Sequence, residues 1–121
     1  MNDTAKQTFF PLVKYTDPAK AIEWLEKAFA IEPHEITKDD EGRIVHAELR
    51  YATGILMITQ QDEATTGGLY VAVDDPDAHH ARAKAAGAEI TMELVDQPYG
   101  SREYGARDLE GNIWYFGTYR P

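Results

Sequence analysis

The segment RIVHAELRY holds the first residues whose types and spacing could do chemistry, His46 and Glu48. Residues two apart on a β-strand project to one face, here opposite the apolar Val45, Ala47 and Leu49. A carboxylate in such a place can act as a general base or anchor a cationic ligand, and Glu48 suits both roles better than His46. A second interpretation is equally open: a solvated strand face whose side chains pair with neighbours across the sheet.

The other histidines offer little for a metal site. His34, His46 and Glu48 would meet only if a hairpin brought them together, and their spacing follows no zinc motif. His79 and His80 are neighbours on an expected helix, where they point about 100° apart and cannot form the i, i+4 pair that binds zinc. We expect both of these histidines to lie on the surface.

Charged and aromatic residues elsewhere also have two interpretations. Arg102 and Glu103 could contact a ligand or form a structural ion pair near the turn at Tyr99. The run 39–42, DDEG, lacks the alternating ligands and terminal Glu of a calcium loop and is predicted to be a hairpin turn. Trp114 could stack on a flat ligand, but its apolar neighbours favour a place in the core.

A weak internal repeat predicts the elements that hold these residues. Asp17-Pro18 follows an extended apolar segment (9–15), and Asp75-Pro76 stands 58 positions later, after another such segment (68–73). In both places Asp can cap a helix and Pro suits its first turn. Strand-like segments follow each helix, so the chain is expected to repeat the order βαβββ twice.

The two expected helices differ in their apolar faces. The helix after Pro18 carries large side chains at helical spacing, among them Leu25 and Phe29. The helix after Pro76 is poor in large apolar groups, and its expected buried face consists of Ala78, Ala81, Ala85 and Ala86. Neither half would bury much surface alone. We therefore predict one α+β domain over 1–121, with modules 8–60 and 67–120.

Composition excludes several classes of function. The 21 acidic and 12 basic residues give a net charge of −9, which argues against nucleic acid and would attract a cationic molecule or simply aid solubility. Without cysteine there is no disulfide framework, thiolate zinc site or cysteine nucleophile. The start MNDTAKQTFF is unlike a signal peptide and no apolar run is long enough for a membrane, so we expect a cytoplasmic protein.

The duplicated βαβββ order, the Asp-Pro helix starts and the closing segments PYGSREY and RDLEGNIW resemble the glyoxalase/bleomycin resistance/dioxygenase (vicinal oxygen chelate) superfamily. The segment HAEL (46–49) and the ending WYFGT (114–118) look closest to its PhnB-like branch. The resemblance covers nearly the whole chain. It implies curved mixed sheets around a ligand pocket, helices over their outer faces, and a homodimer.

Metal-dependent members of this family place one ligand on the first strand of each half and one on the last. The repeat puts these positions at Phe10, Met57, Gly68 and Tyr115, none of which suits a hard divalent metal. We therefore expect no metal and no cofactor. This departure puts glyoxalase or dioxygenase chemistry in doubt, since those reactions depend on the metal.

Strand alternation from these positions predicts a pocket that is largely apolar and aromatic. The leading hypothesis is a metal-free protein that binds and sequesters a cationic or aromatic small molecule. Two alternatives stay open: an enzyme of this fold with a non-standard metal site or Glu48 as base, and a dimeric interaction module. The predicted ligand-binding residues are Phe10, His46, Glu48, Met57, Tyr70, Arg102 and Tyr115.

Overall fold

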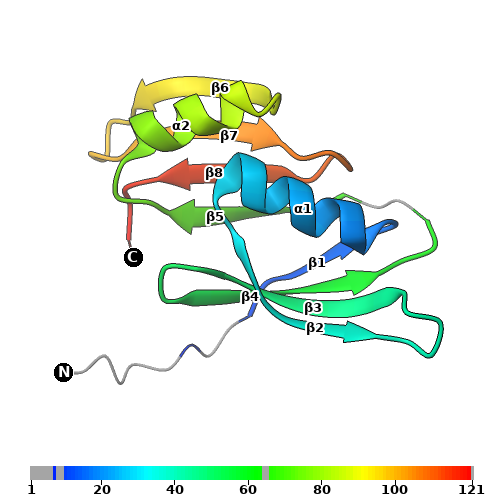
Figure 1. Cartoon of the computed structure of the whole chain (residues 1–121). Helices are drawn as coiled ribbons and strands as arrows, with labels where there is room; N and C mark the ends of the chain where they lie inside the picture. Colours follow the sequence, from blue (N-terminus) through cyan, green and yellow to red (C-terminus); the bar gives the residue numbers. More distant parts are fainter. Residues whose placement is uncertain (1–6, 8–9, 64–65, 121) are drawn as a thin grey trace.

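The computed structural model describes residue 7, residues 10–63 and residues 66–120. The predicted βαβββ order appears twice (Figure 1). Residues 8 and 9, with which the first module and its first strand were predicted to begin, lie outside the described residues. The elements are β1 (Leu12–Tyr15), α1 (Pro18–Phe29), β2 (Glu32–Lys38), β3 (Ile44–Tyr51), β4 (Gly54–Gln60), β5 (Gly68–Ala72), α2 (Pro76–Ala85), β6 (Glu89–Asp96), β7 (Arg102–Arg107) and β8 (Ile113–Gly117).

The strands form two four-stranded mixed sheets. The first sheet has the order β1-β4-β3-β2 and the second the order β5-β8-β7-β6. In each sheet the first strand of the half pairs in parallel with the last, and the other pairs are antiparallel. Both helices are drawn on one side of the two sheets in Figure 1. The predicted fold class is confirmed.

Both helices begin as the sequence predicts. Asp17 caps α1 by accepting a hydrogen bond from the backbone N–H of Lys20, and Asp75 caps α2 by accepting one from Ala78. The two capping residues have nearly the same backbone conformation, with φ of −129° and −128°. The repeat therefore extends to the geometry of the helix starts. Of the described helices, none is long and apolar enough to cross a membrane.

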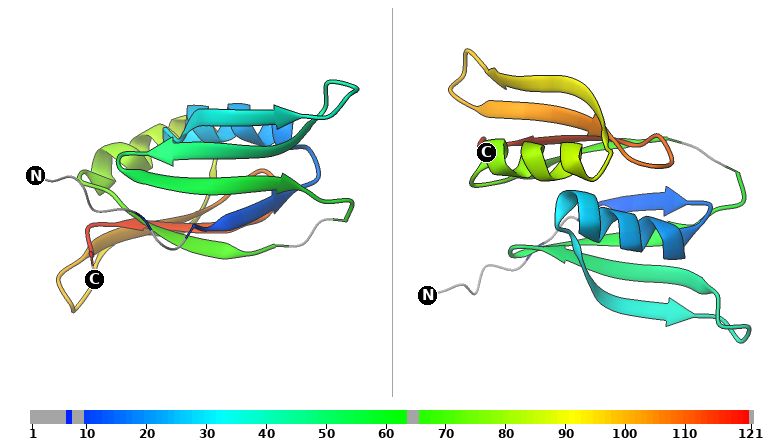
Figure 2. Two further views of the ribbon diagram at one scale, coloured as in Figure 1. Left: turned by 90° about the horizontal axis from the view of Figure 1, so that it is seen from below. Right: turned by 45° about the horizontal axis from the view of Figure 1, so that its top comes forward.

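One core joins the two halves. Side chains alternate along the strands, so that Tyr15 and Trp114 turn to the helix side and are fully buried. Phe29 of α1 packs against Trp114 and Phe116 of β8, with ring centroids 5.3 and 4.8 Å apart. The prediction that Trp114 belongs to the core is confirmed. The halves of one chain thus pack through their helix sides (Figure 2).

The buried face of α2 differs from the predicted alanine stripe. Ala78, Ala81 and Ala85 are exposed and Ala86 is half-buried, whereas His79 and Ala83 are buried. The expectation that His79 lies on the surface is therefore wrong. Its Nδ1 lies 2.6 Å from the Tyr104 hydroxyl and its Nε2 lies 2.8 Å from the carbonyl oxygen of Phe29. Both ring nitrogens have partners, which makes burial of the imidazole tolerable.

Candidate functional site

Each sheet has a second side, turned away from the helices, which we call its open face. On the first sheet the open face carries Leu12, Met57 and Glu48, which lie in register across β1, β4 and β3. On the second sheet it carries Tyr70 and Tyr115, which lie in register across β5 and β8. These five side chains are half-buried or exposed, unlike the core residues on the helix side.

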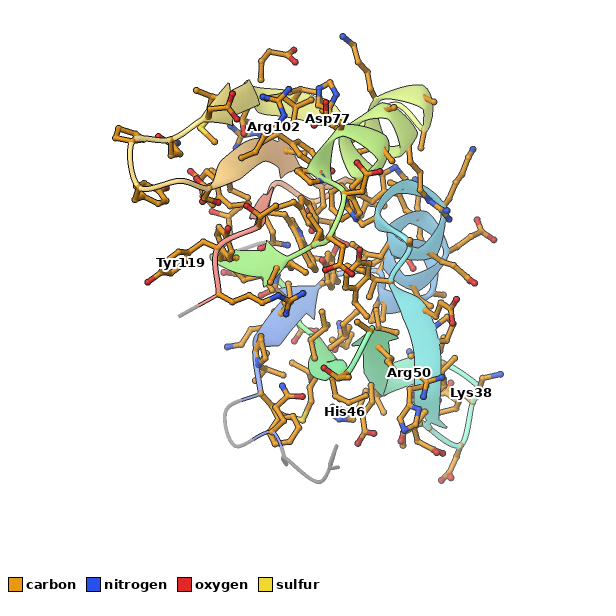
Figure 3. The ribbon with its side chains drawn as sticks, turned by 90° about the vertical axis from the view of Figure 1, so that its left-hand side faces the viewer. Lys38, His46, Arg50, Asp77, Arg102 and Tyr119 are labelled. Atoms are coloured by element: carbon orange, nitrogen blue, oxygen red, sulfur yellow. The ribbon has the colours of Figure 1, made fainter. Side chains whose placement is uncertain are left out.

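The first open face places His46 and Glu48 as alternation predicts. His46 pairs with Thr59 and Glu48 with Met57, and both are half-buried. Figure 3 shows His46 at the side of the first sheet away from the helices. Strand β2 pairs with the other edge of β3, and there Glu35 is the register partner of Glu48. Glu35, Glu48 and Met57 are thus in register on three adjacent strands.

The register also shows which residues stand beside the predicted metal positions. The partner of Met57 is Leu12, and the partner of Tyr115 is Tyr70. Phe10 precedes β1 and is exposed, and Gly68 pairs with Ile113. Apart from Glu48 beside Met57, the register partners of these positions are apolar residues and a tyrosine, and a single carboxylate does not make the donor set that a hard divalent metal needs.

An improvised metal site is not assembled either. Within residues 7, 10–63 and 66–120, no group of three His, Asp or Glu side chains is close enough to hold one metal ion. The combination of His34, His46 and Glu48 therefore does not form in this chain. His34 lies on β2 at a register irregularity, which changes the alternation of that strand relative to β3.

The second open face is built around glycines. Gly105 of β7 pairs with Tyr115, and a Cβ added at Gly105 would stand 3.2 Å from the Tyr115 ring. The same Cβ would stand 2.9 Å from Oγ1 of Thr91, so the Tyr115 ring packs against a position that glycine leaves free. Tyr115 and Tyr70 are each 40% exposed, so two solvent-accessible phenol side chains stand on adjacent strands of this face.

At one end of this face Glu103 receives hydrogen bonds from two tyrosines. Tyr70 donates to its Oε2 at 3.0 Å, and Tyr99, in the turn before β7, donates to its Oε1 at 2.7 Å. Burial would raise the pKa of Glu103, but hydrogen bonds from Tyr99, Ser101 and Tyr70 outweigh it and lower the pKa below its usual value. Glu103 is therefore a carboxylate at neutral pH.

The same bonds act on the tyrosines. The hydrogen bond to Glu103 raises the pKa of Tyr99 to about 12, so its hydroxyl stays protonated and keeps donating. Tyr119, after β8, donates its backbone N–H to the hydroxyl oxygen of Tyr70 at 3.1 Å. The Tyr99 and Tyr119 rings lie 6.0 Å apart at 83° to each other. Three tyrosines thus gather about one carboxylate.

Most of this cluster is not predicted from the sequence. The sequence places Tyr99 in a turn and gives no signal for Tyr119. The alternative of an ion pair between Glu103 and its neighbour Arg102 is wrong, because the two side chains point to opposite faces of β7. Alternation from the buried Tyr104 was the signal that could have placed Glu103 beside Tyr70.

Arg102 lies on the helix side, away from the predicted pocket. Its guanidinium forms ion pairs with Asp77 of α2 at 2.6 Å and with Asp96 at the end of β6 at 3.2 Å. Figure 3 shows Arg102 and Asp77 turned toward each other, with Tyr119 on a different side of the second sheet. These contacts match the structural ion-pair interpretation, although the partners are not Glu103.

A hollow lies between the two halves. It has a volume of about 220 Å³ and is lined by residues from both, among them Tyr51, Ile55, Leu69 and Tyr70. The side-chain amide of Gln7 closes one part of it with hydrogen bonds to the backbone N–H and carbonyl of Ile55, at 2.7 and 2.6 Å. Tyr70 therefore borders both this hollow and the second open face.

Comparisons with known proteins agree with this architecture. The family model of the Glyoxalase/Bleomycin resistance protein/Dioxygenase superfamily matches residues 12–116. An uncharacterized protein of Mycobacterium bovis is 30% identical over 122 aligned residues, covering 88% of this chain and 80% of the relative.

Solved structures show the same fold. TioX from Micromonospora sp. ML1 is 36% identical, with a TM-score of 0.79, over 91% of this chain and 98% of that one. The bleomycin-binding protein of the bleomycin-producing Streptomyces verticillus, complexed with copper(II)-bleomycin, is 21% identical, with a TM-score of 0.67, over 93% and 96% of the two chains. Since the family model spans nearly every described element, the chain belongs to the glyoxalase/bleomycin resistance/dioxygenase superfamily.

Proposed function

We propose that this protein binds a small organic molecule, cationic or aromatic, on the open faces of its sheets and sequesters it without a resident metal or cofactor. The observation that carries the proposal is the pair Tyr70 and Tyr115, which are in register on the adjacent strands β5 and β8 and are each 40% exposed. Exposed phenol rings stack on flat molecules and attract cations through their faces. The net charge of −9 adds a long-range attraction for cations.

Family relationships support a binding role. The Streptomyces verticillus protein of this fold binds copper(II)-bleomycin, so the architecture can serve to hold a molecule rather than to transform it. In the chain described here, Phe10, Met57, Gly68 and Tyr115 at the family's metal positions supply apolar contact and a phenol ring instead of a Lewis acid. Both considerations favour sequestration over metal-assisted catalysis.

We also propose that the protein is a homodimer. Large apolar side chains are exposed on the open faces, Leu12 on the first sheet and Tyr115 on the second. Large apolar side chains that are exposed to solvent are commonly covered at an interface, and an open face of a second copy would close the pocket. Sedimentation equilibrium at micromolar concentration would give a dimer mass, and a monomer mass would overturn this part of the proposal.

We also propose a cytoplasmic location, which the acidic composition supports. The segments 46–49 and 114–118 support the PhnB-like branch of the family. The repeat of the Asp-Pro helix starts supports module boundaries at 8–60 and 67–120.

Thermal unfolding of EDTA-treated protein, with and without a panel of flat aromatic and cationic compounds, tests the binding function. A ligand that binds only the folded protein raises the melting temperature. Compounds that do so should shift the amide NMR signals of β5 and β8. If no compound in the panel raised the melting temperature, or if binding required added metal, the proposed function would be wrong.

A matched pair of variants locates the site. Tyr115→Ala should weaken binding about tenfold, the equivalent of one lost aromatic contact. Ile36→Ala removes an apolar side chain of similar exposure, 39%, from the helix side of β2 and should leave binding unchanged. Equal affinities for the two variants would place the ligand away from the second open face.

A further inference from the structure

Glu103 is a buried carboxylate without a cationic partner. It is 5% exposed, and none of the ion pairs among the described residues includes it. Its neighbour Arg102 is engaged on the other side of the sheet by Asp77 and Asp96. A buried charge normally has an opposite charge nearby, because hydrogen bonds alone leave its field uncompensated.

The groups around this charge are aromatic rings that remain open to solvent. Tyr70, Tyr99 and Tyr119 are 40%, 61% and 48% exposed. The Tyr99 and Tyr119 rings stand nearly at right angles, so their planes form a corner. The hydroxyls of Tyr70 and Tyr99 donate hydrogen bonds to Glu103, and the backbone N–H of Tyr119 donates one to the Tyr70 hydroxyl. These bonds hold the three residues in place.

The backbone is adapted to this arrangement. A Cβ added at Gly117 would collide with the hydroxyl of Tyr70 and stand 2.5 Å from Cγ of Glu103. The glycine thus allows the Tyr70 side chain to cross from β5 over β8 and reach the carboxylate on β7. Such a crossing would be blocked by any other residue at that position.

We propose that Tyr70, Tyr99 and Tyr119 around Glu103, which we call the tyrosine cluster, form a binding site for a weakly hydrated organic ammonium ion. This inference rests on the proposed binding function and names the class of ligand for one end of the second open face. Ring faces attract such ions, and the carboxylate behind them supplies the opposite charge.

The chemistry of the site selects an alkylated ammonium over a metal ion. Both carboxylate oxygens already accept hydrogen bonds from phenols, so the carboxylate is not free to replace the water shell of a hard cation. An alkylated ammonium needs no hydrogen bonds and carries apolar groups that can cover the rings.

Calorimetric and NMR titrations with choline and with its uncharged isostere 3,3-dimethylbutan-1-ol test the inference. The two molecules have the same shape and differ in charge. Choline should bind about tenfold more tightly, a difference of about 1.4 kcal/mol, since aromatic ring faces attract the cation but not its uncharged isostere. The amide signals of residues 99–103 and 117–119 should shift with choline.

Two variants and one control identify the groups responsible. Glu103→Gln and Tyr99→Leu should each reduce the affinity for choline about tenfold and leave that for the isostere unchanged. Tyr99 is exposed in a turn, so its variant folds even if the buried Glu103→Gln does not. Glu93→Gln removes the same charge from an exposed residue beside His80 and should retain full choline affinity.

The outcomes separate this inference from the proposed function. Equal binding of choline and its isostere at the second open face would overturn the ammonium site and leave small-molecule binding intact. Choline binding that survives Tyr99→Leu would also overturn it. Failure of choline, together with stabilisation by neutral aromatic compounds, would have the same meaning, whereas failure of every compound would overturn both proposals.

Discussion

The hydroxyl of Tyr15 donates a 2.6 Å hydrogen bond to Oδ2 of Asp108, two residues that lie 93 positions apart in the sequence. Tyr15 ends β1 of the first half, and Asp108 begins the turn between β7 and β8 of the second. The same Oδ2 accepts a bond from Nε1 of Trp114 at 3.0 Å. Next to it, the Glu110 carboxylate accepts from the backbone N–H groups of Thr16 and Asp17. Hydrogen bonds from Tyr15, Thr16 and Asp17 therefore join the first half of the chain to the second at one end.

Removing the Tyr15 hydroxyl should therefore weaken the whole fold. Tyr15→Phe leaves the ring in the core but takes one donor from a buried carboxylate, which should lower the free energy of unfolding by about 1–3 kcal/mol. Tyr115→Phe is the matched control on the open face and should change it by less than about 0.5 kcal/mol. Urea denaturation measures both, and equal effects would contradict a structural role for the Tyr15–Asp108 bond.

Acid should destabilise the protein through His79. Burial is the main cause that lowers the pKa of His79 below 6.5, and the nearby Arg82 adds to it, while the bond to the Phe29 carbonyl opposes it. Between that lowered value and about 6.5, the unfolded chain binds a proton that the folded chain does not. Stability is therefore full above about pH 6.5 and falls as the pH drops below it.

Urea denaturation between pH 7.5 and pH 5 measures this dependence. His79→Gln should flatten the fall in stability, because glutamine does not titrate. The exposed His34 on β2 offers a control, and His34→Gln should retain the wild-type slope. An unchanged slope in the His79 variant would show that another group is responsible.

A glycine at position 30 should stabilise the protein. Ala30 ends α1 in the left-handed conformation, with φ of 61°, which costs a residue with a Cβ about 1–2 kcal/mol. Ala30→Gly should raise the free energy of unfolding by about 1 kcal/mol. Ala86 ends α2 with φ of −82°, so Ala86→Gly should instead lower it slightly. Thermal unfolding should show a higher melting temperature for Ala30→Gly and a lower one for Ala86→Gly. A loss of stability in Ala30→Gly would contradict the proposed backbone strain at position 30.

An extra methyl group at Gly117 should disrupt the arrangement of side chains in the tyrosine cluster. Gly117→Ala forces Tyr70 and Glu103 apart, which should cost about 1–3 kcal/mol of stability and abolish the preference for choline over its isostere. Gly67→Ala is the control, because its Cβ would meet only Oδ1 of Asn112, at 3.9 Å. If Gly117→Ala bound choline like the wild type, the crossing of Tyr70 over Gly117 would not be needed for the site.

Local sequence signals are enough to predict the order of the elements and the residues at which the helices begin. Asp17-Pro18 and Asp75-Pro76 are local signals, because a capping side chain and the N–H groups that it binds lie within one helical turn. Strand alternation likewise assigned Trp114 and Phe116 to the core and Tyr70 and Tyr115 to the other face. These predictions needed only the periodicity of the backbone.

Tertiary structure alone decided which distant side chains meet. The burial of His79 depends on Phe29 and Tyr104, which come from a different helix and a different strand. An alanine-rich helix has no apolar pattern strong enough to reveal its buried face, so only packing against those partners could select it. Glu103 and Tyr70 lie 33 positions apart and face each other because β5 and β7 flank β8. Strand order and register set that pairing, and neither is encoded in the spacing of single residues.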